Sequence, residues 1–278
     1  MFFSTSSYSL PFLEALYKRG WLSGIVTGPD KAVGRKQIMT ATIPKVFGKE
    51  HGVPVFECKK EMTGTVEFLK SVGAEIGLVF SFPYIIPISV IDYFKMDSFI
   101  NIHPGKLPKY RGASPIQTTI LNNDSSITLS FITVDEKMDA GKIVLEKEYP
   151  LKGIETFGFL LELLVNEAAN LLPDLLTKPR ELKEQTGIPG FTKKITKEGT
   201  FVEWKDLKKK GVYLKLRAYS PTPGLWTIIP DGKRMKILSG HLKDNYFDPE
   251  DVVVEGKTKT SWKDLVRLLG IEPSTSTL

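Results

Sequence analysis

Short apolar runs alternate with longer, half-polar segments along the first two thirds of the chain. The runs at residues 24–27, 54–56, 76–80 and 98–100 are largely apolar, which is typical of strands buried on both faces of a sheet. The segments between them, at residues 44–50, 62–72 and 88–95, favour helices. Strands that alternate with helices form parallel sheets. We therefore predict an α/β domain with a doubly wound, mostly parallel sheet.

The two ends of this domain have their own patterns. Residues 1–6 resemble the end of a strand, so we expect a clipped first strand, and residues 10–16 follow as a helix with Pro11 in its first turn. Later segments predict a helix at 115–121, strands at 127–134 and 143–149, and a long helix at 156–176 that closes the domain.

After residue 191 the pattern changes to short segments of strand character separated by turns. These segments lie at residues 212–218, 225–229, 235–238 and 252–254. Short strands in this arrangement predict a small barrel or sheet. We divide the chain into a first domain at residues 1–180, a polar linker at 181–199 and a small β-barrel domain at 200–278.

Composition excludes several classes of protein. Hydrophobic residues make up 41% of the 278, enough for a core in each domain. No apolar run approaches the roughly 20 residues that a membrane helix needs, so we predict no membrane contact. The single cysteine, Cys58, excludes an internal disulfide, and we expect an inert thiol in a reducing compartment.

The net charge of +6 is unevenly distributed, because lysines and arginines crowd the later third of the chain among tryptophans and tyrosines. Such a cluster is either a solvated face or a set of phosphate contacts to a nucleic acid. Composition alone leaves both readings open.

Candidate chemistry gathers around one strand end. Asn101 and His103 follow a short buried strand and are two residues apart, so their side chains share one face of an extended segment. Ligands bind at the carboxyl ends of strands in open α/β sheets. A loop rich in proline and glycine follows, where Arg111 either holds the loop or meets a phosphate. Asp139, before Gly141 in a second loop, can reach back to the imidazole.

The residues that carry these side chains resemble a known signature. The run N-I-H-P-G-K-L-P-K-Y-R-G-A-S-P-I at residues 101–116, followed by M-D-A-G-K-I-V at 138–144, resembles the signature of the folate-dependent formyltransferases. The resemblance implies a Rossmann-like formyltransferase domain in which Asn101, His103 and Asp139 carry formyl transfer. Gly105 and Lys106 depart from the usual Ser and Leu, which affects the loop's shape and its folate contact.

The resemblance also implies the formyl donor and its binding residues. The donor is 10-formyltetrahydrofolate, with no metal, and the three histidines of the chain are too scattered to form a ligand cluster. The apolar loop at residues 81–87, which contains two prolines, either forms part of the pterin slot or is a buried connection. The expected donor-binding residues are Phe82, Pro83, Tyr84, Ile85, Ile86, Pro104 and Gly105.

Two further segments are similar to those family members that formylate methionyl-tRNA. They are G-P-D-K-A-V-G-R-K at residues 28–36 and R-A-Y-S-P-T-P-G at residues 217–224. The second segment lies in the second domain, which we expect to be an OB-like barrel. In this segment Thr222 stands where the family usually has Trp. The first segment is either an RNA contact or a mobile surface loop. The implied partner is the methionyl initiator tRNA, contacted by Arg35, Lys36, Lys194, Lys208, Lys209 and Arg217.

The expected function is therefore transfer of a formyl group to the α-amine of methionyl initiator tRNA. Two alternatives stay open: a formyltransferase for a small amine on the same scaffold, and a non-catalytic RNA-binding homologue. The opening F-F-S-T-x-x-Y-S-L-P is similar to eukaryotic organellar members, which implies the mitochondrial matrix, although no presequence is visible. We expect a monomer.

Overall fold

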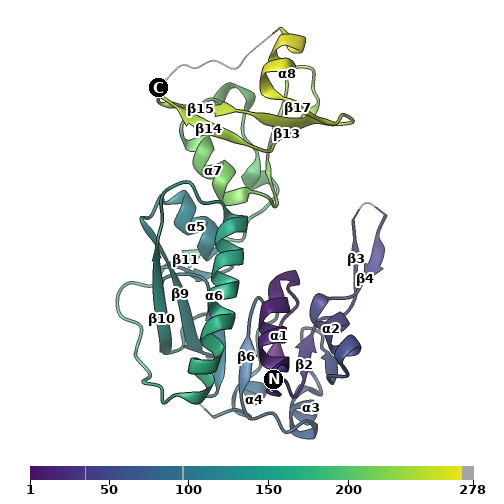
Figure 1. Ribbon diagram of the computed structural model, residues 1–278, viewed down its shortest axis with the longest axis vertical. Coiled ribbons are helices and arrows are strands. Elements are labelled where there is room, and N and C mark those ends of the chain that lie inside the picture. The colour runs from purple at the N-terminus through teal and green to yellow at the C-terminus, as the bar shows by residue number, and fades with distance from the viewer. Residues whose placement is uncertain (35, 96, 271–278) are drawn as a thin grey trace. The chain divides into compact units, whose positions relative to one another are not determined.

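The computed structural model describes residues 1–34, 36–95 and 97–270 and forms two compact units (Figure 1). Unit 1 comprises Met1–Gly112, Thr128–Glu148 and Glu162–Phe191. Unit 2 comprises Ala113–Ile127, Tyr149–Leu161 and the chain from Thr192 onward. Two segments from within the range predicted as the first domain thus belong to unit 2.

A seven-stranded sheet organises unit 1, with the order β10-β9-β7-β6-β1-β2-β5. Parallel pairs join β1 to β2 and β6, β2 to β5, and β6 to β7, whereas β7 and β9 are antiparallel. The predicted mostly parallel sheet is therefore confirmed. Its strands are β1 (Phe2–Phe3), β2 (Ile25–Thr27), β5 (Val55–Glu57), β6 (Gly77–Val79), β7 (Phe99–His103), β9 (Ser126–Thr133) and β10 (Ile143–Pro150).

The apolar runs form the central strands because both faces of those strands are covered. Every residue of β1, β2 and β6 is buried. Phe3 packs on Phe99 with ring centroids 5.2 Å apart, and Phe94 packs on Phe99 at 4.5 Å. The helices that this part of the sequence contributes are η1 (Ser7–Ser9), α1 (Leu10–Tyr17), α2 (Ile43–His51), α3 (Thr65–Ser71), α4 (Ile88–Ile91) and α6 (Phe157–Thr177).

A β-hairpin projects from the body of unit 1 (Figure 1). Its strands, β3 (Lys31–Val33) and β4 (Ile38–Thr40), pair antiparallel and are exposed throughout. At its base, the Thr27 and Thr42 hydroxyls are 2.8 Å apart, and Lys45 Nζ lies 2.6 Å from Asp30 Oδ1. The predicted polar loop is thus a hairpin that is anchored at its base.

Unit 2 contains a small antiparallel sheet in the order β12-β13-β16-β17 and a separate hairpin, β14-β15. The strands are β12 (Leu225–Ile228), β13 (Arg234–Ile237), β14 (Gly240–Lys243), β15 (Tyr246–Pro249), β16 (Asp251–Val254) and β17 (Lys259–Ser261). Fully buried Leu225, Met235 and Phe247 contribute to its core. The predicted small β domain is confirmed.

Helices complete unit 2. They are α5 (Pro115–Leu121), η2 (Glu198–Thr200), η3 (Trp204–Asp206), α7 (Gly211–Tyr219) and α8 (Trp262–Leu269), and α5 packs against α7. The short strands β8 (Arg111–Gly112) and β11 (Phe191–Thr192) complete the elements of the described chain. Within the described ranges, no helix has the combined length and apolar character that crossing a membrane requires.

The prediction of a strand at residues 212–218 is wrong, because this segment is helix α7. The apolar residues alternate there, which favoured a strand. The buried Val212, Leu216 and Tyr219 also follow the i, i+4, i+7 spacing of one helix face, and the segment is rich in helix-forming Leu, Lys, Arg and Ala.

Candidate active site

Strand β7 carries two of the predicted catalytic side chains at its carboxyl end. Asn101 is half-buried, and only 3% of the surface of His103 is exposed. In the sheet, Asn101 lies beside Val79 of β6, and His103 lies beside Ser130 of β9. The two residues are two positions apart in one strand, as the sequence predicted, and therefore share a face.

The loop after β9 brings Asp139 back toward this strand. Gly141 permits the approach, because a Cβ at that position would lie 1.7 Å from the Thr133 carbonyl oxygen. Asp139 itself has a φ of 51°, in the left-handed region, which Asp tolerates better than most residues. A glycine two residues after Asp139 is thus required, because the chain passes too close to Thr133 for a side chain.

The Asp139 carboxylate joins three segments of the chain. Its Oδ1 accepts a hydrogen bond from Asn101 Nδ2 at 3.1 Å, and its Oδ2 accepts one from the Gly112 N–H at 2.7 Å. Oδ2 also lies 3.6 Å from His103 Nδ1, and 11% of the Asp139 side chain is exposed. The predicted convergence of Asn101, His103 and Asp139 is therefore present, with Asp139 at its centre.

The other nitrogen of the His103 ring is held by the backbone. Nε2 lies 2.8 Å from the Tyr110 carbonyl oxygen, inside the protein. A carbonyl oxygen only accepts, so Nε2 carries a proton and donates it. In the neutral ring, Nδ1 then bears the lone pair. The nitrogen that faces Asp139 is the one able to accept a proton.

One polar side chain that sequence reasoning missed supports the same loop. Gln185 lies in the segment predicted as a linker, and its Nε2 donates to the Asp139 and Gly141 carbonyl oxygens at 2.8 Å each. Its Oε1 accepts from Arg111 Nε and Nη2 at 3.1 and 2.7 Å. Of the two roles left open for Arg111, the structure favours that of holding the loops. No periodic pattern singled out Gln185.

The residues predicted to bind the donor follow β6 and β7, which are neighbours in the sheet. Phe82 packs edge-on against buried Phe3 with centroids 5.9 Å apart and against Tyr84 at 5.4 Å, whereas 74% of Ile85 is exposed. Pro83 is exposed, and Ile86 and Pro104 are half-buried. The buried Gly105 donates its N–H to the His103 carbonyl oxygen at 3.0 Å. The loop is thus anchored by aromatic packing and presents apolar surface.

The cations predicted to contact RNA fall into two groups. Lys36 and Lys194 are exposed, and Arg35 lies outside the described residues. Lys209 is also on the surface, although its Nζ lies 3.0 Å from Asp206 Oδ1. Lys36, Lys194 and Lys209 are therefore placed where a phosphate can reach them.

The other two cations require a correction, because they lie inside unit 2. Only 4% of Lys208 is exposed, and its Nζ lies 3.1 Å from Asp248 Oδ1. Only 3% of Arg217 is exposed, and its Nε donates to the Glu155 carbonyl oxygen at 3.0 Å. Both cations hold segments of their own unit together, so we withdraw them from the predicted RNA contacts.

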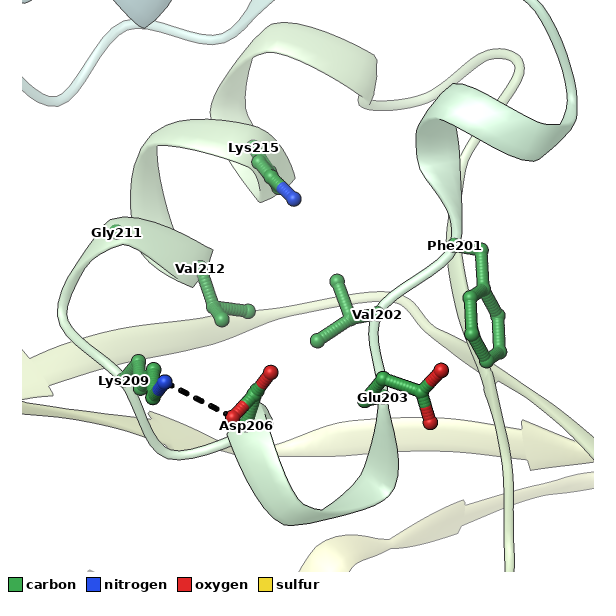
Figure 2. Close-up of a pocket in the computed structure, with 8 residues that line it drawn as sticks. All are labelled: Phe201, Val202, Glu203, Asp206, Lys209, Gly211, Val212 and Lys215. Carbon is green, nitrogen blue, oxygen red and sulfur yellow. Dashed lines mark ion pairs between the residues drawn. The ribbon is translucent and has the colours of Figure 1, made fainter. Parts of the chain in front are cut away.

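A cavity of about 310 Å³ in unit 2 has a different character. Figure 2 shows Val202 and Val212 facing one another, with Lys215 directed between them and the Asp206–Lys209 ion pair beside them. Two acidic and two basic side chains line it, so it has no net preference for an anion. Its lining is Phe201, Val202, Glu203, Asp206, Lys209, Gly211, Val212 and Lys215, without any of the predicted catalytic residues.

Two further predictions concern the reactivity of Cys58 and the absence of a metal. Cys58 is buried, and burial raises the pKa of its thiol to about 11, in keeping with the expected inert cysteine. Among residues 1–34, 36–95 and 97–270, no three His, Cys, Asp or Glu side chains gather as a metal site would require. A metal-free reaction stays a prediction.

Comparisons with known sequences identify the family of both parts of the chain. Residues 2–176 match the family described as formyl transferase, and residues 194–267 match the formyl transferase C-terminal domain. The chain belongs to the formyl transferase family.

Among its relatives are bacterial methionyl-tRNA formyltransferases. The enzyme of Latilactobacillus sakei is 30% identical over 95% of this chain and 84% of its own. That of Pseudothermotoga lettingae is 32% identical over 86% and 78%. In these two alignments the similarity thus extends over most of both proteins.

Solved structures share the fold. A methionyl-tRNA formyltransferase from Clostridium thermocellum superposes with a TM-score of 0.65 at 19% identity, covering 91% of this chain and 96% of that one. A sugar 3N-formyl transferase superposes with a TM-score of 0.63 at 17% identity, covering 92% and 97%. At these identities the likeness concerns the fold alone.

Proposed function

We propose that this chain transfers the formyl group of 10-formyltetrahydrofolate to the α-amine of methionyl initiator tRNA. The observation that carries the proposal is the Asp139 carboxylate, which binds Asn101 at 3.1 Å and lies 3.6 Å from His103 Nδ1 at the end of β7. The relatives named methionyl-tRNA formyltransferase support the choice of acceptor.

The cluster supplies what this reaction needs. A bond forms between the amine nitrogen and the formyl carbon, and the bond between that carbon and the folate nitrogen breaks. Negative charge develops on the formyl oxygen, and the Asn101 amide has a second proton to donate to it. One such preorganised donor is worth about two to three powers of ten in rate.

In this mechanism His103 carries the proton from the amine to the folate nitrogen. Its Nδ1 lone pair accepts the proton that the attacking amine loses, and the same proton then goes to the departing folate nitrogen. Between these steps the ring is a cation, and the Asp139 carboxylate 3.6 Å away stabilises it. The Nε2–H bond to the Tyr110 carbonyl, at 2.8 Å, keeps the ring in one orientation throughout.

The donor residues fit a flat, partly apolar ligand. The loop that bears Phe82, Tyr84 and Ile85 presents apolar surface after β6, the strand adjacent to β7. A ligand pocket of this kind combines apolar walls with a few backbone hydrogen-bonding groups. We therefore keep Phe82–Ile86, Pro104 and Gly105 as the proposed donor contacts.

We propose that exposed cations orient the tRNA. Lys36 lies on the β3–β4 hairpin, and Lys194 and Lys209 lie on unit 2. Phosphate contacts position a nucleic acid and make its binding depend on salt. Lys36, Lys194 and Lys209 form the revised set, with Arg35 kept from the sequence prediction.

The test compares acceptors. Purified protein is incubated with 10-formyltetrahydrofolate and, in parallel, methionyl initiator tRNA, uncharged tRNA, free methionine or a small amino sugar, over a series of salt concentrations. We expect formylation of the charged tRNA alone, with a rate that falls steeply as salt rises. Formylation of the amino sugar would favour the small-amine enzyme, and salt-sensitive tRNA binding without turnover would favour the RNA-binding homologue.

Two further proposals concern the protein's setting. A mitochondrial matrix location rests on the resemblance of the opening residues alone, and imaging of the tagged full-length protein in its own cells tests it. A monomeric state is tested by sedimentation at several protein concentrations. A non-mitochondrial signal or a dimer would end the respective proposal.

A further inference from the structure

The segment at residues 183–190 is fastened to the catalytic loops at both ends. Near its start, Lys183 exchanges two backbone hydrogen bonds with Ile143, at 2.9 and 2.7 Å. Near its end, the Gly190 N–H donates to the Pro108 carbonyl at 2.9 Å, and the Gly190 carbonyl accepts from the Arg111 N–H at 3.0 Å. These anchors hold the intervening residues against the loops that contain Arg111 and Asp139.

Gln185, between the anchors, uses the whole hydrogen-bonding capacity of its amide. Its nitrogen donates to the carbonyls of Asp139 and Gly141, and its oxygen accepts twice from Arg111. The orientation of the amide is unambiguous, because the two carbonyls can only accept and the guanidinium can only donate. Few substitutions can satisfy both sides at once.

We infer that Gln185 is a positioning residue that fixes the Asp139 carboxylate in the active site; the inference rests on the proposed function. Asp139 occupies the left-handed region at a φ of 51°, a conformation that persists where its surroundings determine it strongly. Gln185 constrains the backbone of this loop, because its side chain donates to the carbonyls of Asp139 and Gly141. The carboxylate is then directed at Asn101 and the Gly112 N–H.

Three variants test this role. Gln185→Ala removes both halves of the contact. Gln185→Glu keeps an acceptor for Arg111 but replaces the N–H donors with oxygens that repel the two carbonyls. Thr186→Ala, at the exposed neighbouring position, is the matched control. For each variant, kcat and both KM values for formyl transfer are measured, together with the thermal midpoint and the hydrogen exchange of the Gly112 amide, which the Asp139 carboxylate protects.

We expect both Gln185 variants to lose about tenfold to a hundredfold in kcat, with KM values within about threefold of the wild type, because a small misplacement of a catalytic group has an effect of this size. Gly112 exchange rises at least about tenfold, and Thr186→Ala matches the wild type. If Gln185→Ala does not fold, Gln185→Glu, which retains the Arg111 contact, decides.

The outcomes separate this inference from the proposed function. Unchanged kcat in folded Gln185 variants of an active enzyme, or a rise in KM alone, overturns the positioning role and leaves formyl transfer intact. If the wild type formylates no acceptor, the proposed function fails, and Gly112 exchange decides the inference alone. Faster exchange in Gln185→Ala then supports the positioning of Asp139, and unchanged exchange overturns it.

Discussion

Oδ2 of Asp139 lies 3.6 Å from Nδ1 of His103, close enough for an ion pair but beyond a hydrogen bond. Because Nε2 of the ring already donates to the Tyr110 carbonyl, Nδ1 carries a proton only when the ring is charged. In the proposed reaction, the attraction between the two residues is therefore largest once His103 has taken a proton from the attacking amine. The geometry would stabilise that charged stage more than the neutral ring.

Replacing Asp139 by Asn should slow formyl transfer severely. Asn101 and the Gly112 N–H donate to different oxygens of Asp139, so in the Asn variant one of the two donors faces an NH2 group instead of an acceptor. The Asn side chain also has no charge to stabilise the His103 cation. We expect kcat to fall by about 10²- to 10⁴-fold, the usual contribution of proton transfer by a positioned side chain. Steady-state kinetics with methionyl-tRNA measures this. An Asp139→Asn enzyme within a factor of a few of the wild type would show that the carboxylate has no such role.

The neutral imidazole of His103 should exist as the Nε2–H tautomer. The Tyr110 carbonyl, 2.8 Å from Nε2, accepts from that nitrogen and leaves the lone pair on Nδ1. Nitrogen-15 NMR of the labelled protein distinguishes the two ring nitrogens at a pH where the ring is neutral. A protonated Nδ1 in that spectrum would reverse the assignment of the proton-accepting atom. His241, whose Nδ1 lies 3.0 Å from the accepting Glu250 Oε1, provides the reference signal of the opposite, Nδ1–H tautomer.

The pairing of Asn101 with His103 was predictable because both end one apolar strand, two positions apart. Asp139, 38 residues after Asn101, was included because the run that contains it resembles the formyltransferase signature. Gln185 was not predictable, since its partners lie 46 and 44 residues earlier and a polar segment has no periodicity to reveal them.

Lys208 and helix α7 show the same limit. Lys208 and Lys209 are adjacent and chemically alike, and only the fold distinguishes them. Asp248, 40 positions later, binds Lys208 inside the unit. In α7, alternating apolar residues also satisfied a helical spacing, and packing against α5 selects one face of the helix. Periodicity thus predicted elements better than it predicted their long-range partners.

Exposed and buried lysines should therefore respond differently to substitution. Lys36→Ala removes a cation from the surface of the hairpin, so we expect weaker methionyl-tRNA binding and a salt dependence reduced by about one unit of slope. The unfolding midpoint should not change. Binding titrations at several salt concentrations measure both effects, and an unchanged slope would remove Lys36 from the proposed interface.

Lys208→Met should instead lower the stability of the protein. It leaves Asp248 without its cation in a largely buried setting, and loss of one partner of a buried ion pair costs about 3 kcal/mol. Urea unfolding measures the loss, and the salt slope of tRNA binding to the folded variant should match the wild type. A reduced slope with unchanged stability would restore Lys208 as an RNA contact.

The stability of unit 2 should depend on the ionisation of Glu155. Burial alone would raise the pKa of this carboxyl, but hydrogen bonds from the backbone N–H groups of Lys152, Gly153, Ile154 and Glu155 outweigh burial and lower it below 4.5. A pKa lower in the folded than in the unfolded state contributes stability above 4.5, which is lost as the pH falls through the folded value.

Glu155→Gln tests this dependence. At neutral pH the variant should be less stable than the wild type by about 2 kcal/mol, because the backbone donors lose a charged acceptor. The difference should shrink below pH 4.5, the ordinary pKa of a glutamate carboxyl. Denaturant unfolding at several pH values measures it, with Glu181→Gln, whose side chain is 82% exposed, as the control. A difference that does not vary with pH would mean that ionisation of Glu155 is not involved.

A single-turnover measurement shows whether this chain formylates methionyl initiator tRNA through the proposed cluster of Asn101, His103 and Asp139. Labelled 10-formyltetrahydrofolate and methionyl initiator tRNA are mixed with excess wild type, His103→Asn, or His241→Asn as the matched control. We predict rapid transfer by the wild type and by His241→Asn, and transfer slower by about 10²- to 10⁴-fold in a folded His103→Asn that still binds the tRNA. No transfer by the wild type would overturn the proposed function, and equal transfer by His103→Asn would show that His103 does not carry the reaction.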